Sequence, residues 1–197
     1  MIDPAGKVSF DTPAFRQAID FYASFYRDKL VPTAADFDQT AGFISGSAPM
    51  LISGPYLAQS LAGIQGKWAA APLPSDSTDT SLFAGSTLGV WHTSTKVAAA
   101  LKLFDFLSQP STQVAWYKLD GDLPSNKTAL SDPSLTSDPN FQIYAKQLQN
   151  SQLLPLVPAW DTIQTDMLTA VNKIVLTGAN ETSALNQLDQ TVAGLQR

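Results

Sequence analysis

Apolar residues recur every three or four positions along most of this chain, which is the period of an amphipathic helix. The clearest case follows Thr12-Pro13, a hydroxyl N-cap with proline at the first helical position, and predicts a helix over residues 13–29 with a buried aromatic face. The same period predicts further helices at 35–44, 96–107, 111–118, 159–176 and 181–195, and one that begins at Asp138-Pro139. The helix at 96–107 is apolar on nearly every side, so we expect it to be buried.

Short apolar runs bounded by glycine and proline predict strands between these helices. They lie at 48–53, at 68–72 and within 82–92. The sequence therefore predicts an α/β chain that is mostly helical, with a few short strands. So few strands do not complete a sheet, and we expect the chain to be part of a larger fold.

Composition excludes several classes of function. The chain has 197 residues, of which 44% are hydrophobic and 15% charged, enough to form a core. Its net charge is −5 and its basic residues do not cluster, so we expect neither a nucleic acid nor an anionic membrane surface as a partner. It has no cysteine, which excludes disulfides and thiol chemistry. No phosphate-binding glycine loop and no metal-ligand spacing occur, so we expect no cofactor and no metal.

Candidate catalytic residues are few. His92 is the only histidine and no nucleophile motif accompanies it, so we interpret it as a polar residue at a strand end. Paired aspartates would serve a glycoside hydrolase, although capping and the helix dipole also explain aspartates at helix starts. The pairs are Asp36 and Asp38, Asp120 and Asp122, and Asp161 and Asp166. A glycoside-hydrolase fragment stays open as an alternative, as does a non-catalytic interaction module.

Two aromatic residues lie at helix starts rather than inside a periodic pattern. Tyr56 follows Gly54-Pro55 at a strand–helix turn, and Trp160 precedes Asp161 at the start of the helix over 159–176. Aromatic faces stack on the C–H faces of sugars, and a nearby carboxylate binds hydroxyls. The two rings therefore indicate a saccharide site, and hydrophobic stapling of each helix entry is the alternative interpretation.

The order of the motifs resembles the C-terminal half of a bacterial extracellular solute-binding protein of ABC importers, in the carbohydrate class that is similar to maltose-binding protein. The segments that carry the resemblance are 8–15, 43–56, 68–74, 85–96 and 121–124. They include the Gly-Pro-aromatic turn at Tyr56, where the best-known members have tryptophan, and the Gly-Asp-Leu-Pro loop at 121–124.

This resemblance implies a type II periplasmic-binding-protein-like fold without catalysis. Residues 1–84 and 155–197 would form the C-terminal lobe, and 88–150 would belong to an N-terminal lobe whose main sheet is missing. A mono- or oligosaccharide would bind between the lobes. The residues that would contact it are Gly54, Tyr56, Gly85, Ser86, Trp160 and Asp161.

The resemblance also implies a place and a partner for the protein. We expect an extracytoplasmic location, with ABC transporter permease subunits as partners. Membrane association would come only from an N-terminal anchor that this sequence lacks.

Overall fold

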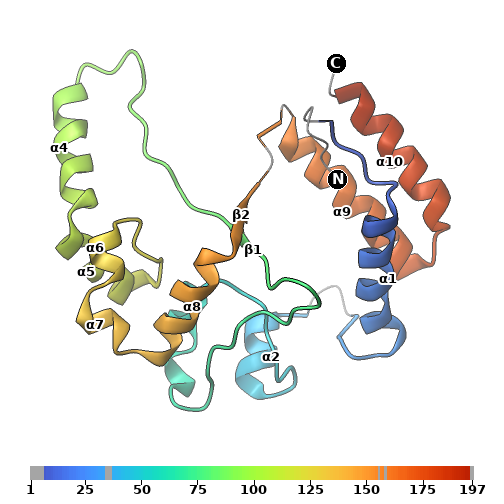
Figure 1. Cartoon of the computed structure of the whole chain (residues 1–197), viewed down its shortest axis with the longest axis horizontal. Helices are drawn as coiled ribbons and strands as arrows, with labels where there is room; N and C mark the ends of the chain where they lie inside the picture. Colours follow the sequence, from blue (N-terminus) through green and yellow to red (C-terminus); the bar gives the residue numbers. More distant parts are fainter. Residues whose placement is uncertain (1–6, 34–36, 155, 158, 196–197) are drawn as a thin grey trace. The chain divides into compact units, whose positions relative to one another are not determined.

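The chain folds into two compact units in the computed structural model, which describes residues 7–33, 37–154, 156–157 and 159–195 (Figure 1). Unit 1 consists of Met1–Gln39 and Pro155–Arg197, and unit 2 consists of Thr40–Leu154. Over the described ranges, no helix combines the length and the apolar character that crossing a bilayer requires.

Unit 1 is built from α1 (Pro13–Arg27), α9 (Trp160–Thr177) and α10 (Glu181–Leu195), which confirms the helices predicted there. The Oγ1 atom of Thr12 accepts a hydrogen bond of 3.2 Å from the N–H of Phe15 and so caps α1. Gly178 ends α9 with a left-handed φ of 70°, a conformation that a residue without Cβ adopts at little cost.

The core of unit 1 gathers the apolar faces of these three helices and the segment before α1. Its buried members are Val8, Phe10, Ile19, Ile163, Ala170, Leu185, Leu188 and Val192. Burial of one large aliphatic or aromatic side chain stabilises a fold by about 1.5–3 kcal/mol, so this cluster is the main source of stability of the unit. The apolar residues that repeat along 159–176 and 181–195 thus lie on the helix faces that form this core.

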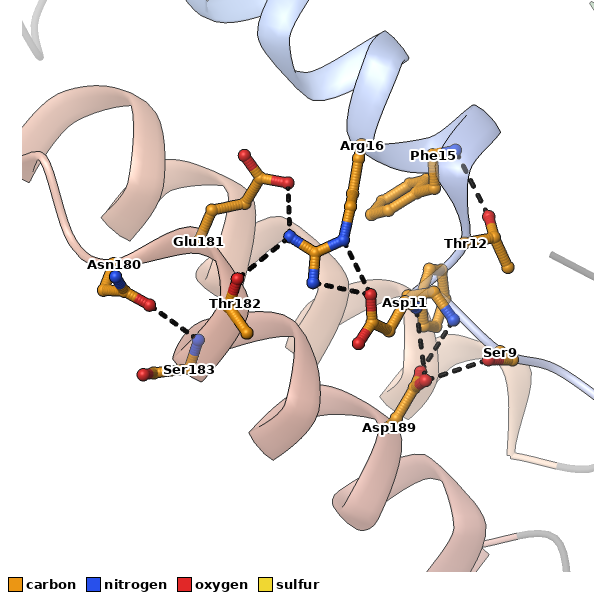
Figure 2. A network of polar contacts seen from close by, with 11 residues as sticks. Ser9, Asp11, Thr12, Phe15, Arg16, Asn180, Glu181, Thr182, Ser183 and Asp189 are labelled. Atoms are coloured by element: carbon orange, nitrogen blue, oxygen red, sulfur yellow. Dashed lines mark hydrogen bonds and ion pairs between the residues drawn. The ribbon is translucent and has the colours of Figure 1, made fainter.

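Polar contacts fix the segment before α1 to the helix α10 (Figure 2). The carboxylate of Asp189 accepts hydrogen bonds from Ser9 Oγ at 2.9 Å, from Phe10 N at 2.6 Å and from Asp11 N at 3.2 Å. Arg16 on α1 pairs with Asp11 at 2.6 Å and with Glu181 at 2.9 Å. The buried Phe10 is thus held in place by both its ring and its backbone.

Unit 2 contains short helices and one small sheet. The helices are α2 (Gln39–Ser45, which begins at the unit boundary), α3 (Leu57–Ser60), a 3₁₀ turn (Ala62–Ile64), α4 (Val97–Ser108), α5 (Pro110–Asp120), α6 (Lys127–Leu130), α7 (Pro133–Thr136) and α8 (Pro139–Gln149). The strands β1 (Ser81–Phe83) and β2 (Ser151–Leu153) pair in parallel with Leu82 opposite Gln152. Its buried apolar residues are Leu61, Ala129, Leu135 and Phe141.

Two strand predictions are wrong. Residues 48–53 and 68–72 contain no strand, and within 82–92 only Leu82 and Phe83 belong to a strand, β1 (Ser81–Phe83). A strand is stable only where a neighbour accepts and donates its backbone hydrogen bonds. Met50 and Ile52 lie 86% and 78% exposed, so no layer covers this run in the described part of unit 2.

The predicted burial of the helix at 96–107 is also wrong. The helix forms as α4, but it has no buried residue, and the side chains of Leu101, Leu103 and Phe106 are each more than half exposed. α4 contacts α5 (Figure 1). The periodicity identified the helix correctly, whereas burial depends on an apolar partner that its own sequence does not specify. The helix predicted at 35–44 begins at Gln39, and residues 34–36 lie outside the described residues.

Candidate functional site

The turn at Gly54-Pro55-Tyr56 places an aromatic ring at the start of α3. The N–H of Leu57 bonds to Gly54 O at 3.2 Å, and the N–H of Ala58 bonds to Pro55 O at 3.0 Å, so the first helical turn forms directly after the proline. Tyr56 is 56% exposed as a residue, and its hydroxyl accepts a hydrogen bond of 3.4 Å from Ser53 Oγ. A large aromatic face is therefore presented to solvent on a fixed turn.

Two glycines lie close to Tyr56, and a side chain at either would meet it. A Cβ atom at position 54 would lie 2.6 Å from Tyr56 Cε1, so the ring covers the position where a side chain would be. Gly121 has a φ of 87°, and a Cβ atom there would lie 2.8 Å from Pro55 O and 2.9 Å from Tyr56 Cα. Gly54 thus allows the ring to fold over the turn, and Gly121 allows the end of α5 to pack against its backbone.

Trp160 and Asp161 belong to unit 1. Trp160 is the first residue of α9, half-buried against the apolar core of that unit, and its indole Nε1 is buried with no hydrogen-bond partner among the described residues. Ala159 before it has a left-handed φ of 57° and provides no side-chain cap. Asp161 is exposed in the first turn of α9, where the positive end of the helix dipole favours a carboxylate.

Gly85 and Ser86 lie in the extended segment that follows β1. Both are exposed, and nothing lies within 4 Å of a Cβ atom added to Gly85. His92 is exposed as well and lies beside Trp91, with ring centroids 5.1 Å apart. No group of three or more His, Asp or Glu side chains in the described ranges is arranged to hold a metal ion.

The structure brings together only part of the predicted site. Gly54 and Tyr56 contact each other in unit 2, and Trp160 and Asp161 are neighbours in unit 1. Gly85 and Ser86 share unit 2 with Tyr56. The role of all six residues in binding stays a prediction, as does the assignment of 1–84, 155–197 and 88–150 to lobes.

Sequence reasoning missed a groove in unit 2. It has a volume of about 370 Å³ and lies between the α3 region and the helices α5, α7 and α8. Three half-buried aromatic side chains line it: Trp68, Tyr117 and Tyr144. These residues come from three separate segments, so no local pattern in the sequence identified them together.

The electrostatics of this groove depend on burial and on Asp138. Burial, the charge of Asp138 and the neighbouring Tyr144 raise the pKa of Tyr117 to about 12. Burial and Asp138 also raise the pKa of Tyr144 above its ordinary value. Both hydroxyls are therefore neutral donors at physiological pH, and Asp138 lies close enough to act on both. A second cavity, of about 480 Å³, lies in unit 1 and is lined by Tyr26, Arg27 and the end of α9.

Comparison with known proteins places the chain in a family. Residues 3–143 match the family described as bacterial extracellular solute-binding protein, and the chain belongs to it. A comparison with curated proteins finds no match.

Solved structures of sugar-binding proteins share the fold. The sugar-binding protein MalE from the phytopathogen Xanthomonas citri is 27% identical, with a TM-score of 0.84 over 96% of this chain and 50% of that one. Maltose-bound MalE3 of T. maritima is 24% identical, with a TM-score of 0.80 over 98% of this chain and 53% of that one. The maltose-maltodextrin binding protein of Alicyclobacillus acidocaldarius is 18% identical, with a TM-score of 0.80 over 97% of this chain and 53% of that one.

These matches confirm the predicted family and fold class. The chain has the periplasmic-binding-protein fold of MalE-like proteins, mostly helical with short parallel strands, and spans about half the length of the structures it matches. Its family is one of extracellular binding proteins, in agreement with the predicted extracytoplasmic location.

Proposed function

We propose that this chain is part of the substrate-binding component of an ABC sugar importer and binds a mono- or oligosaccharide in a cleft between two lobes. The observation that carries the proposal is the exposed ring of Tyr56 on a turn packed against Gly54 and Gly121. An aromatic face held in place loses little conformational freedom when a sugar stacks on it. The family and the similarity to the sugar-binding MalE of Xanthomonas citri support this ligand class.

The other predicted contacts complete the proposed site. Gly54 leaves room for the ring, and Gly85 and Ser86 would provide backbone and hydroxyl contacts on the segment after β1. Trp160 and Asp161 would contribute a second aromatic edge and a carboxylate from the start of α9. Four of these residues would belong to the C-terminal lobe, and Gly85 and Ser86 to the segment between the lobes. A ligand that also contacts the other lobe would favour the closed state by its higher affinity for it.

The exposed apolar surface supports the proposed division into lobes. Leu101, Leu103 and Phe106 of α4 and Leu82 and Phe83 of β1 are exposed. In a protein of twice this length, further strands and helices would cover these side chains. The exposed face of α4 is expected if 88–150 belongs to a lobe whose main sheet is missing. The C-terminal lobe would be formed by 1–84 and 155–197, and permease subunits would contact the closed protein.

Binding without catalysis is part of the proposal. Asp132 and Asp138 cap α7 and α8 through hydrogen bonds to Ser134 N at 2.8 Å and Asn140 N at 2.9 Å, which is a structural use of helix-start aspartates. The glycoside-hydrolase alternative needs two carboxyl groups set across one bond. Among the described residues, no observation favours it over binding.

The test is a titration of the 197-residue protein with saccharides, followed by NMR. We expect glucose, maltose or maltotriose to shift the amide signals of Ser53 and Leu57, on both sides of Tyr56. Tyr56→Ala should weaken binding by about 1–3 kcal/mol, the effect of losing an aromatic anchor. Tyr22→Phe, an aromatic change in unit 1, is the control. Unchanged affinity in the Tyr56 variant would contradict the proposed role.

A further inference from the structure

The groove of unit 2 is a second place where aromatic and polar side chains converge. Trp68 follows the 3₁₀ turn, Tyr117 lies on α5 and Tyr144 lies on α8, and all three line the groove. Tyr117 also packs edge-to-face on the buried Phe141 with centroids 4.9 Å apart, which fixes the orientation of its ring. The groove therefore has aromatic side chains from three separate segments, one of which, Tyr117, is held by a ring contact.

Three polar side chains that line the groove form hydrogen bonds with other groups of unit 2. Asn140 accepts a hydrogen bond of 2.8 Å from Ala70 N, Gln59 donates one of 3.3 Å to Lys118 O, and Lys118 donates one of 2.9 Å to Ser134 Oγ. Each of these bonds holds one polar group of the lining, which reduces the conformational freedom that its side chain would lose on binding a ligand.

Several side chains that line the groove carry polar groups with capacity to bind a ligand. Asp138 uses Oδ1 to cap α8, which leaves Oδ2 as an acceptor. Over the described residues, no hydrogen bond occupies the hydroxyl of Tyr117, the hydroxyl of Tyr144 or the indole N–H of Trp68. Three donors and a carboxylate oxygen beside aromatic faces match the hydroxyls and the apolar C–H face of a sugar ring.

Size and charge fit one neutral ring. A volume of about 370 Å³ lies at the lower end of the range of small-molecule pockets, about 300–1,000 Å³. Asp138 and Lys118 contribute one charge of each sign to the lining, so the groove does not select an ion. These properties favour a compact polyhydroxyl group over a phosphate or a peptide.

The groove adjoins the Tyr56 turn through Gly121. Gly121 lines the groove, and its α-carbon packs on the backbone of Pro55 and Tyr56. We propose that this groove is a saccharide subsite beyond the Tyr56 ring, holding one further ring, so that the ligand of this protein is an oligosaccharide. The inference rests on the proposed function for the class of ligand and assigns new roles to Trp68, Tyr144 and Asp138.

The test measures how affinity depends on the length of the saccharide. Wild type, Tyr144→Phe and Asp138→Asn are titrated with glucose, maltose and maltotriose, and the indole signals of the four tryptophans are followed by NMR. A Trp68→Phe variant identifies the signal of Trp68. Asparagine still caps a helix, so the Asp138 variant keeps the start of α8. Tyr22→Phe in unit 1 removes a hydroxyl far along the chain from the groove and is the matched control.

We expect maltotriose to bind at least tenfold more tightly than glucose and to shift the Trp68 signal. Tyr144→Phe and Asp138→Asn should each weaken the binding of maltotriose about three- to tenfold, the effect of one lost hydrogen bond, and leave the binding of glucose unchanged.

Equal affinity for all three saccharides, with a Trp68 signal that does not move, would overturn the subsite and leave the proposed function standing. If Tyr56→Ala binds maltotriose with the affinity of wild type and the Trp68 signal still shifts, the groove is supported as a saccharide site and the role of Tyr56 is overturned. Absence of any saccharide binding would overturn both.

Discussion

The α-carbon of Gly121 packs directly on the backbone of Tyr56: a Cβ atom at position 121 would lie 2.9 Å from Tyr56 Cα. Gly121 ends α5 with a left-handed φ of 87°, so the same residue terminates one helix and supports the turn that starts another. The placement of the exposed Tyr56 ring therefore depends on a contact between residues far apart in the sequence.

Substitution of Gly121 tests this contact. Gly121→Ala should destabilise unit 2 by about 2–4 kcal/mol, because the change adds a clash with backbone atoms to the cost of a left-handed alanine, itself about 1 kcal/mol. Gly178→Ala is the matched control: it has a left-handed φ of 70° but nothing within 4 Å of the added Cβ, so it should cost only the smaller amount. Urea unfolding measures both. Equal losses of stability would show that the contact with Tyr56 has no energetic effect.

The ring of Tyr56 covers Gly54, which predicts a change in binding rather than in folding. Gly54→Ala would place a methyl group 2.6 Å from Tyr56 Cε1, so the ring must rotate away. A displaced side chain costs little stability, but it removes the stacking face, and we expect saccharide affinity to fall about tenfold with the unfolding midpoint nearly unchanged. Gly89→Ala, with open space around the added Cβ, should change neither quantity.

Asp189 connects α10 to the segment before α1 by three hydrogen bonds. Asp189→Asn should lower the free energy of unfolding of unit 1 by about 1–3 kcal/mol, since hydrogen bonds to a charged acceptor are stronger than those to a neutral amide. Asp20→Asn, an exposed aspartate on α1, is the control and should change it by less than about 0.5 kcal/mol. Hydrogen exchange at the amide of Phe10 should accelerate in the Asp189 variant alone.

The apolar faces of α9 and α10 are buried because the elements that pack against them are present in the same unit. Ile163 and Ala170 on α9, and Leu185 and Leu188 on α10, follow helical spacing and lie in one buried cluster in unit 1. The apolar residues of α4 are spaced just as regularly, yet Leu101 among them is exposed in the structure. Periodicity determines the helix, whereas burial is decided by what packs against it.

The candidate site was predictable only where its signal is local. Gly54-Pro55-Tyr56 is a contiguous turn, and its position before a helix could be inferred from three residues. The support from Gly121 and the groove with Trp68 arise from tertiary contacts between separate segments. No spacing in the sequence encodes such contacts, so the structure was needed to find them.

Tyr117 predicts a loss of stability at alkaline pH. Burial, Asp138 and Tyr144 raise its pKa from 10.0 to about 12 in the folded protein. Between pH 10 and about 12, the folded state therefore keeps the Tyr117 proton that the unfolded state releases. The contribution of Tyr117 to stability is fully present below pH 10 and is lost as the pH rises towards 12. Tyr117→Phe cannot ionise and should flatten this decline. Urea unfolding of both proteins between pH 9 and about 12, with phenolate absorbance to follow ionisation, measures the effect. Parallel declines in the two proteins would contradict the raised pKa of Tyr117, because another group would then be responsible for the loss.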